Sequence, residues 1–469
     1  MNPYRLIILS VAGLALTACD PNCEFPDGED DDADGYLSSV DCDDDNASVH
    51  PAADEIAYDG VDQDCSGADL TDVDGDGYDA TEAGGDDCDD MDLATNPASV
   101  ELCDDIDNNC DGQVDEDGAS DAESYYPDTD GDGFGDPLGL ISACSQPDGH
   151  VPNPSDCDDN DAEIHPGTTL EMLDIDMVFL CDGTFEMGSP LSEVGRESHE
   201  RLHTVSLTHP FYMGRTEVTH EQFASVMGYN PSETAGTCPG DCAVENIDWS
   251  QAAAFANELS EQLGLPMCFL CTGEDQDVIC DYSRNFDTPY DCPGFRLPTE
   301  AEWEYGARAG ESAAMLSGGN LADEDDFYYC DGDLILDNGS NLDDHALYCG
   351  SSGLIDTPVA SRLPNNWGLY GMAGTMLEWT GDLYIAILYD ETDPVGAEGP
   401  GYTDRVFRSG CYWFAPKHSR SADRGYINPN FFYSLLGMRL AITQTPALMN
   451  ALASGVDTSA HPDDTANLQ

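Results

Sequence analysis

Basic side chains are almost absent from the first 195 residues of this 469-residue chain. Arg5 is the only Lys or Arg before Arg196, and the sequence has 14 basic residues against 95 acidic ones, a formal net charge of −81. Proteins that bind nucleic acid or anionic lipid headgroups present basic surfaces. The charge therefore argues against nucleic acid and against an anionic membrane surface as binding partners.

Long hydrophobic runs are also lacking. The longest, Leu6–Leu16, is too short for a bilayer span, which takes about 20 apolar residues. It follows Arg5, as in a signal peptide, and it ends in Leu16–Cys19 (LTAC), which resembles a bacterial lipobox. The resemblance implies cleavage before Cys19 and a lipid on its thiol; an ordinary signal peptide with a chance cysteine is the alternative. We expect residues 1–19 to be a lipoprotein signal peptide.

The lipid on Cys19 would then be the chain's only membrane contact. We expect the anchored protein to lie in the cell envelope, at the outer membrane or the cell surface rather than the inner membrane. The 19 cysteines also favour an exported protein in an oxidising compartment, and eighteen remain for pairing if Cys19 carries lipid.

The acidic residues are concentrated in one segment. Between Asp20 and Leu170 there are 48 Asp and Glu residues and no Lys or Arg. Such a segment repels itself and holds few large apolar side chains, so it cannot fold on hydrophobic burial alone. Either it is disordered, or cations and disulfides hold it together.

Short aspartate loops repeat within this segment. Asp72–Tyr78 and Asp128–Phe134 match closely, and Asp30–Tyr36 is a looser copy. Aspartates at positions 1, 3 and 5 followed by glycine match the first half of an EF-hand loop, whose alternate carboxylates converge on one hard cation. The pattern predicts metal ligands at Asp30, Asp32, Asp34, Asp72, Asp74, Asp76, Asp128, Asp130 and Asp132.

The ligand that closes an EF-hand loop stands at position 12. In the first copy this position is Asp41, which we therefore add to the predicted ligands. In the second and third copies it is Ala83 and Gly139, so those loops lack the usual closing carboxylate.

A second element follows each loop. It reads Asp-Cys-Asp-Asp at residues 41–44, 87–90 and 156–159, and a Pro-containing segment comes after it. We expect residues 20–168 to form one region of metal-binding repeats, because residues 30–168 resemble the MopE-type metal-binding repeats of bacterial surface proteins; the resemblance implies metal binding without identifying the metal. Oxygen ligands favour calcium, with copper or zinc through His50 and His165 as the less favoured alternative.

The cysteines of these repeats are expected in disulfides rather than as metal thiolates. Cys42 and Cys65 are spaced much like Cys88 and Cys110, which makes each of them a candidate pair. The simplest interpretation of the repeats is a calcium-stiffened stalk without chemistry of its own.

The composition becomes globular from about Leu173. Capping-box patterns predict helices that begin at Thr219 and Thr299, and apolar residues at i+3/i+4 spacing predict another over Trp249–Leu263. Thr184–Ser189 suits a strand and a turn. Because Gly, Pro and Asn are frequent between these elements, we expect a loop-rich α+β domain with short strands.

Several motifs of this half occur in the order found in one enzyme family. They are residues 211–219 (FYMGRTEVT), 294–305 (GFRLPTEAEWEY), 366–374 (NWGLYGMAG), 405–410 (RVFRSG), 420–424 (RSADR) and 437–440 (GMRL). They resemble the formylglycine-generating enzyme, or sulfatase-modifying factor, family. The resemblance implies a C-type-lectin-like fold for residues 170–443, and we expect residues 444–469 to be a disordered tail.

Copper chemistry is where the sequence departs from this family. Family enzymes oxidise a substrate cysteine to formylglycine with Cu(I) held by two cysteines near the end of the domain. The corresponding segment, 409–420, has only Cys411. The sequence thus argues against copper and leaves Cys411 as a weak catalytic candidate, expected in a disulfide with a residue such as Cys181 or as a buried thiol.

The resemblance also implies structural calcium near residue 378. Glu378 is the ligand that remains, while Thr375 replaces the family's usual Asn. Further disulfide candidates lie in insertion-like loops: Cys238 with Cys242, Cys330 with Cys349, and Cys268 and Cys271 with Cys280 and Cys292.

Our hypothesis is a lipoprotein with calcium-binding repeats and a non-catalytic domain that binds a glycan, a peptide or a cell-wall component. The alternative is an active superfamily enzyme, a formylglycine-generating oxidase or a related protein-modifying oxidoreductase with a relocated site. A third interpretation makes the repeats the functional part, as a calcium buffer or an adhesive stalk.

Overall fold

The computed structural model describes residues 28–453, except 117, 163, 236–237, 239, 331, 352–356 and 398–400. The predicted signal peptide and Cys19 lie outside the described residues. Within the described residues, no helix combines the length and the apolar character needed to cross a membrane. Contacts divide the chain into a smaller unit, residues 1–123 with 142–145, and a larger unit, residues 124–141 with 146–469.

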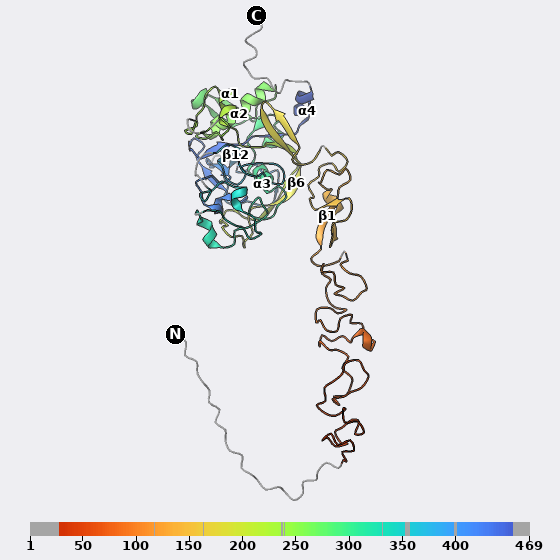
Figure 1. Ribbon diagram of the computed structural model, residues 1–469. Helices are drawn as coiled ribbons and strands as arrows, with labels where there is room; N and C mark the ends of the chain where they lie inside the picture. The colour runs from red at the N-terminus through yellow and green to blue at the C-terminus, as the bar shows by residue number, and fades with distance from the viewer. Residues whose placement is uncertain are drawn as a thin grey trace, which may run out of the picture. The chain divides into compact units, whose positions relative to one another are not determined.

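The smaller unit holds the first two repeats and consists mainly of turns (Figure 1). Its short 3-10 helix is η1 (Thr81–Ala83). Apolar side chains such as Ile56, Met91 and Leu93 remain exposed. The disulfides in this unit pair Cys42 with Cys65, Cys88 with Cys110, and Cys103 with Cys144. Cross-links and polar contacts therefore take the place of an apolar core.

The third repeat belongs to the larger unit. Strands β1 (Glu123–Pro127) and β3 (His150–Val151) pair antiparallel there, while β2 covers Ile141–Ala143. A disulfide joins Cys157 to Cys181, and Phe134 and Ile164 pack against the core clusters of the larger unit. By contacts the third repeat therefore groups with the domain that follows it, and the division between the two compact units lies near residue 123.

The larger unit is an α+β structure with short strands, as expected. Its five-stranded antiparallel sheet has the order β11-β17-β8-β5-β4. The bounds of these strands are β11 Phe295–Arg296, β17 Ala441–Thr443, β8 Phe211–Gly214, β5 Ile175–Leu180 and β4 Thr169–Met172. Buried side chains on both faces of β5 and β8 place this sheet in the middle of the core.

Three smaller sheets surround it. A four-stranded sheet has the order β15-β14-β12-β16, in which β12 and β16 run parallel, and a three-stranded sheet has the order β13-β7-β6. A hairpin pairs β9 with β10 and is closed by the disulfide Cys271–Cys280. The bounds are β15 Gly425–Ile427, β14 Arg405–Arg408, β12 Leu377–Leu383, β16 Leu436–Met438, β13 Glu391–Thr392, β7 His203–Leu207, β6 Gly183–Met187, β9 Phe269–Thr272 and β10 Ile279–Tyr282.

The three predicted helices are present, and capping boxes begin all of them. They are α1 (His220–Met227), α2 (Trp249–Gln262) and α3 (Glu300–Arg308). In α2 the Asp248 carboxylate accepts the N–H of Gln251, and the Gln251 side-chain oxygen accepts the N–H of Asp248. The 3-10 helices of this unit are η2 Pro137–Gly139, η3 Asp275–Asp277, η4 Pro289–Asp291, η5 Glu324–Tyr328, η6 Leu342–Asp344 and η7 Pro416–Ser419.

A fourth helix, α4 (Pro446–Ala453), lies in the segment expected to be a disordered tail. Its Leu448 is fully buried, and Ala451 and Leu452 pack against the same core cluster. The expectation is therefore wrong for residues 446–453, because three apolar side chains at helical spacing find a tertiary surface. Residues 454–469 lie outside the described residues.

Buried ion pairs hold the elements of the larger unit together. Several glutamates are buried against arginines: Glu302 with Arg296 (2.7 Å), Glu378 with Arg439 (2.8 Å), Glu300 with Arg424 (2.6 Å), Glu200 with Arg420 (2.7 Å), and Glu304 with Arg308 of the same helix (2.7 Å) and with Arg408. Such pairs stabilise a fold only when both members are present, since either charge alone is costly to bury.

We predict that Glu304→Gln destabilises the chain by roughly 3–5 kcal/mol, because Arg308 and Arg408 are then buried with an uncompensated charge. Burial alone would raise the pKa of Glu304, but the two arginines lower it to about 2. An unfolded glutamate has a pKa of about 4.3, so this contribution is complete above about pH 5 and is lost as the pH falls towards 2.

Urea unfolding at neutral and acidic pH measures this effect. Glu258→Gln, on the exposed face of α2, is the matched control and should leave the unfolding midpoint unchanged. Equal midpoints for Glu304→Gln and the unmodified chain at neutral pH would contradict the role assigned to this carboxylate.

Candidate metal sites and the Cys411 region

The aspartate loops of the second and third repeats are folded by bonds to their first carboxylate. In the second repeat, Asp72 accepts the N–H groups of Gly75 and Gly77 at 2.8 and 3.1 Å, and Asp128 makes the equivalent bonds in the third repeat. Gly77 has a φ of 103°, which L side chains rarely adopt. The first aspartate of these two loops thus already uses both oxygens to shape the loop.

Three other carboxylates in each repeat use only one oxygen in this way. In the second repeat the Oδ1 atoms of Asp74, Asp76 and Asp87 accept backbone N–H groups at 3.1, 2.8 and 2.9 Å. Their Oδ2 atoms are buried and have no hydrogen-bond donor among the described residues. The same is true of the Oδ2 atoms of Asp32, Asp34 and Asp41 in the first repeat and of Asp130, Asp132 and Asp156 in the third.

The loop aspartates lie close together in the first two repeats. One oxygen from each of Asp72, Asp74 and Asp76 lies within 4.8 Å of the others, and the same holds for Asp30, Asp32 and Asp34. Burial raises the pKa of Asp87, and the charges of Asp76 and Asp90 raise it further. Nine buried oxygens, three in each repeat, therefore repel their neighbours, and a cation would relieve that repulsion.

Asp87 and Asp156 are ligand candidates that the EF-hand comparison missed. Asp87 is 1% exposed and Asp156 is 8% exposed. Burial raises the pKa of Asp74, and the nearby charge of Asp87 contributes to this rise. Burial also raises the pKa of Asp156, and the charges of Asp132 and Asp130 raise it further. The first residue of the Asp-Cys-Asp-Asp element thus supplies the carboxylate that the loop lacks at position 12. The recurrence of this element after every loop was the signal in the sequence that could have identified them.

The last aspartate of the same element fixes the loop against it. Asp90 accepts the N–H of Val73, Asp159 accepts that of Thr129 at 2.7 Å, and Asp44 accepts that of Asp31. This N–H belongs to position 2 of the loop in each repeat. Hydrogen bonds between the protein's own groups therefore hold the loop and the element together.

The histidines of the first and third repeats pack rather than join these clusters. His50 stacks on Tyr36 with ring centres 4.9 Å apart, and His165 stacks on Phe134 at 4.7 Å. Each aromatic ring follows directly on the Gly that ends a loop, so the stack anchors the loop to the following Pro-containing segment. This arrangement gives both histidines a structural role.

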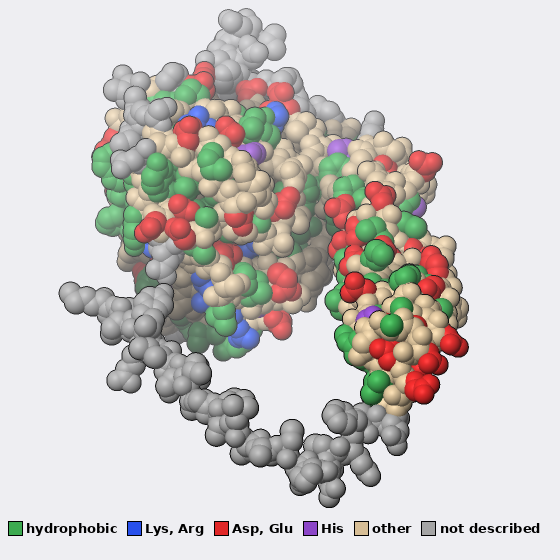
Figure 2. Space-filling model, turned by 60° about the horizontal axis from the view of Figure 1, so that its bottom comes forward, with side chains coloured by type: hydrophobic (Ala, Val, Ile, Leu, Met, Phe, Trp, Pro, Cys, Tyr) green, Lys and Arg blue, Asp and Glu red, His purple; other side chains and the backbone are tan. Residues whose placement is uncertain are grey.

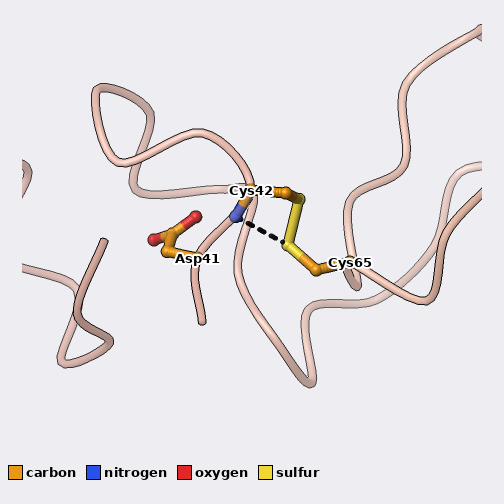
Figure 3. A group of neighbouring side chains, drawn as sticks. All are labelled: Asp41, Cys42 and Cys65. Carbon is orange, nitrogen blue, oxygen red and sulfur yellow. Dashed lines mark hydrogen bonds between the residues drawn. A yellow bond between two sulfur atoms is a disulfide. The ribbon is translucent and has the colours of Figure 1, made fainter. Parts of the chain in front are cut away.

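The sulfur atoms near the clusters are bonded to each other. Cys42 and Cys65 lie close to Asp41, but their sulfur atoms are joined in a disulfide (Figure 3). Carboxylate oxygens are therefore the available ligands, and hard oxygen ligands suit calcium or magnesium rather than copper. Figure 2 shows the acidic side chains of the repeats with no basic side chain among them.

A second kind of acidic group accompanies the cluster in the first repeat. One ligand atom from each of Glu55, Asp62 and Asp64 lies within 4.8 Å of the others. Both oxygens of Asp62 accept backbone N–H groups, from Ser66 and Gly67, and all three acids are partly exposed to solvent. This group is more exposed to solvent than the sets of buried Oδ2 atoms described above, and more of its carboxylate oxygens accept hydrogen bonds.

Glu378 is placed differently from the expectation. It is fully buried in β12, where Arg439 binds both of its oxygens and the Trp303 Nε1–H donates to one of them at 2.7 Å. Its charge is thus balanced by arginine, so the predicted calcium role of Glu378 is wrong. The sequence could not show this, because Arg439 is 61 residues away.

Cys411 is a buried free thiol, which was one of the two expected states. It is 1% exposed, and burial raises its pKa to about 12, so the thiol stays protonated at neutral pH. The suggested bond to Cys181 is wrong, since Cys181 pairs with Cys157. The remaining disulfides of the larger unit are Cys238–Cys242, Cys268–Cys292, Cys271–Cys280 and Cys330–Cys349, all among the candidate cysteines.

Comparison with known proteins identifies the family. The profile of the sulfatase-modifying factor enzyme 1-like domain matches residues 167–444, more than half of the chain. The chain belongs to the sulfatase-modifying factor family. A second profile, for a metal-binding motif of the MopE type, matches residues 41–69, 87–116 and 156–169. Those matches contain Asp41, Asp87 and Asp156 but not the aspartate loops before them.

Among similar proteins of the sulfatase-modifying factor family is the formylglycine-generating enzyme of Streptomyces coelicolor, 29% identical over 56% of this chain and 88% of the relative. The chaperone protein LppX of Paenibacillus barcinonensis is 30% identical over 36% of this chain, which spans 61% of the relative's length. The Bos taurus formylglycine-generating enzyme is 31% identical over 33% of this chain and 40% of its own length.

A solved structure, Treponema denticola variable protein 1, aligns with a TM-score of 0.47 and 27% identity over 59% of this chain and 98% of that protein. PvdO from Pseudomonas aeruginosa aligns with a TM-score of 0.45 and 23% identity over 60% and 99%.

The copper chemistry of formylglycine-generating enzymes does not fit the residues of this member of the sulfatase-modifying factor family. A Cu(I) bis-thiolate needs two thiolates, and Cys411 is the only described cysteine outside a disulfide. The protonated, buried thiol of Cys411 is a poor metal ligand because the thiolate is the form that binds. We therefore derive no reaction step through copper.

We predict that Asp87→Asn weakens calcium binding at the second repeat by at least roughly tenfold, because it removes one of three converging charges. Asp86→Asn, an exposed neighbour with the same change of charge, should have no such effect. Isothermal titration of the full chain with calcium measures both. Identical titrations for the two variants would show that Asp87 is not a ligand.

Proposed function

We propose that the three acidic repeats bind calcium. The observation that carries this is the set of nine buried carboxylate oxygens without a donor, three in each repeat. Three carboxylates from two adjoining turns suit a cation that accepts irregular oxygen coordination, and calcium tolerates this better than magnesium does. Waters and backbone carbonyls would complete the shell.

We also propose that the domain of residues 167–444 is a binding module without formylglycine-generating activity. Its fold elements and family motifs are intact, while its single free thiol is buried and protonated. A module of this kind binds a glycan, a peptide or a cell-wall component through its surface.

An active oxidase of the same family is the second candidate. It is supported by the similarity to the Streptomyces coelicolor enzyme, of which this chain covers 88%. Such an enzyme would need a metal or redox site built from residues other than a cysteine pair.

Copper binding separates the two candidates. We predict that the full chain, titrated with Cu(I) against a chromogenic chelator, takes up no stoichiometric copper, and that Cys411→Ser behaves like the unmodified chain. One Cu(I) bound per chain and lost in Cys411→Ser would contradict the non-catalytic proposal and favour the oxidase.

We further propose that the chain is a lipoprotein of the cell envelope, anchored through Cys19 at the outer membrane or the cell surface. The apolar run Leu6–Leu16 and the LTAC segment support this. Each unit also contains internal disulfides, which are typical of exported proteins.

When the chain is expressed in a bacterium fed an alkyne-labelled fatty acid, we predict label on the unmodified chain and none on Cys19→Ala. Cys23→Ala is the matched control and should retain the label. Absence of label from the unmodified chain, or equal label on Cys19→Ala, would contradict the anchor.

A further inference from the structure

A groove of about 840 Å³ runs along β6 within the larger unit. One wall is formed by residues 182–186, at the start of and along β6, and the other includes Tyr126 of β1 and Pro154–Asp156 of the third repeat. The groove therefore lies between the family domain and the third metal cluster, to which Asp156 belongs. It is separate from Cys411, which is not among its lining residues.

Strand β6 offers an unpaired edge to this groove. It is the last strand of the order β13-β7-β6 and pairs only with β7 among the described strands (Figure 1). Its backbone groups on the other side are available for an added strand, and open sheet edges bind extended peptides in this way. An extended segment of a partner is thus the shape that the groove accepts.

The base of the groove is aromatic. Phe185 packs against Tyr305 with ring centres 5.2 Å apart, and Tyr305 packs against Trp367 at 4.9 Å. Gly183 allows this approach, because a Cβ there would lie 2.5 Å from the Tyr305 hydroxyl. Alternate side chains of an added strand would meet this apolar surface, since strand side chains point to opposite faces in turn.

The rim of the groove is acidic, and its one arginine is already bonded to other groups of the protein. Asp182 and Glu186 are exposed there, and Glu311 also lines it. The one basic residue of the lining, Arg308, binds Glu304 and the carbonyl oxygen of Gly188. Charge complementarity therefore favours a basic partner over an acidic or neutral one.

We propose that this groove binds an extended, basic peptide segment of a partner protein, which adds a strand to the free edge of β6. The proposal rests on the proposed role of the domain as a binding module and names the class of ligand. Because Asp156 belongs both to the wall and to the third cluster, calcium at that cluster fixes the wall and strengthens peptide binding.

The direct test is fluorescence anisotropy with the calcium-loaded full chain. The probe is a labelled peptide of about eight residues that alternates lysine with valine, and the control probe alternates glutamate with valine. We expect saturable binding of the first probe only. Stronger binding of cellohexaose in competition, or equal binding of both peptides, would overturn the proposal.

A charge-reversal pair tests the location. Asp182→Lys with Glu186→Lys should weaken binding of the lysine peptide by at least roughly tenfold, and the neutral pair Asp182→Asn with Glu186→Gln should weaken it less. Glu258→Lys with Glu261→Lys, two exposed acids of α2, changes the net charge equally and should leave binding unchanged. Equal losses for both reversal pairs would mean attraction by net charge alone and would overturn the groove as the site.

The calcium dependence distinguishes this proposal from the one it rests on. We expect Asp130→Asn, in the third cluster, to reduce peptide affinity at least roughly fivefold, while Asp74→Asn, in the second, leaves it unchanged. A chain that binds calcium but no peptide contradicts only the groove. A chain that binds the peptide with equal affinity in calcium and in chelator contradicts the calcium coupling.

Discussion

A buried carboxylate needs a positive charge beside it, and this requirement governs both halves of the chain. In the family domain arginine supplies this charge to Glu304, Glu378 and their counterparts, which are buried against guanidinium groups. The first two repeats have no Lys or Arg, yet they too bury carboxylates such as Asp87. No side chain supplies the balancing charge there, and this is the basis for proposing a bound cation in the repeats.

This difference explains how the repeats can fold without an apolar core. One oxygen of each of these aspartates accepts a backbone N–H, which sets the turn, and the other oxygen has no donor among the described residues and is available for the proposed cation. The disulfides and the aromatic–histidine stacks keep the turns together. In the third repeat the disulfide Cys157–Cys181 joins the repeat to the family domain, and Asp156 of its carboxylate cluster lines the groove at β6.

The sequence predicted those features that depend on neighbours along the chain. Capping boxes located α1 and α3, apolar spacing located α2, and regular spacing identified the pairs Cys42–Cys65 and Cys88–Cys110. It failed where partners are brought together by the fold. Asp87 and Asp156 follow the last loop aspartate by 11 and 24 residues, so no fixed spacing reveals them. Glu378 was misassigned because Arg439 reaches it only in the folded chain, and α4 was missed because burial of Leu448 depends on tertiary contacts.

The most direct test of this account is a count of bound calcium. Equilibrium dialysis followed by elemental analysis would compare the full chain with a variant that combines Asp41→Asn, Asp87→Asn and Asp156→Asn. Because these residues supply one unpaired oxygen to each cluster, the account predicts that the variant loses about three calcium ions per chain. Equal calcium contents, or no calcium in either protein, would contradict the claim that metal ions balance the buried carboxylates of the repeats.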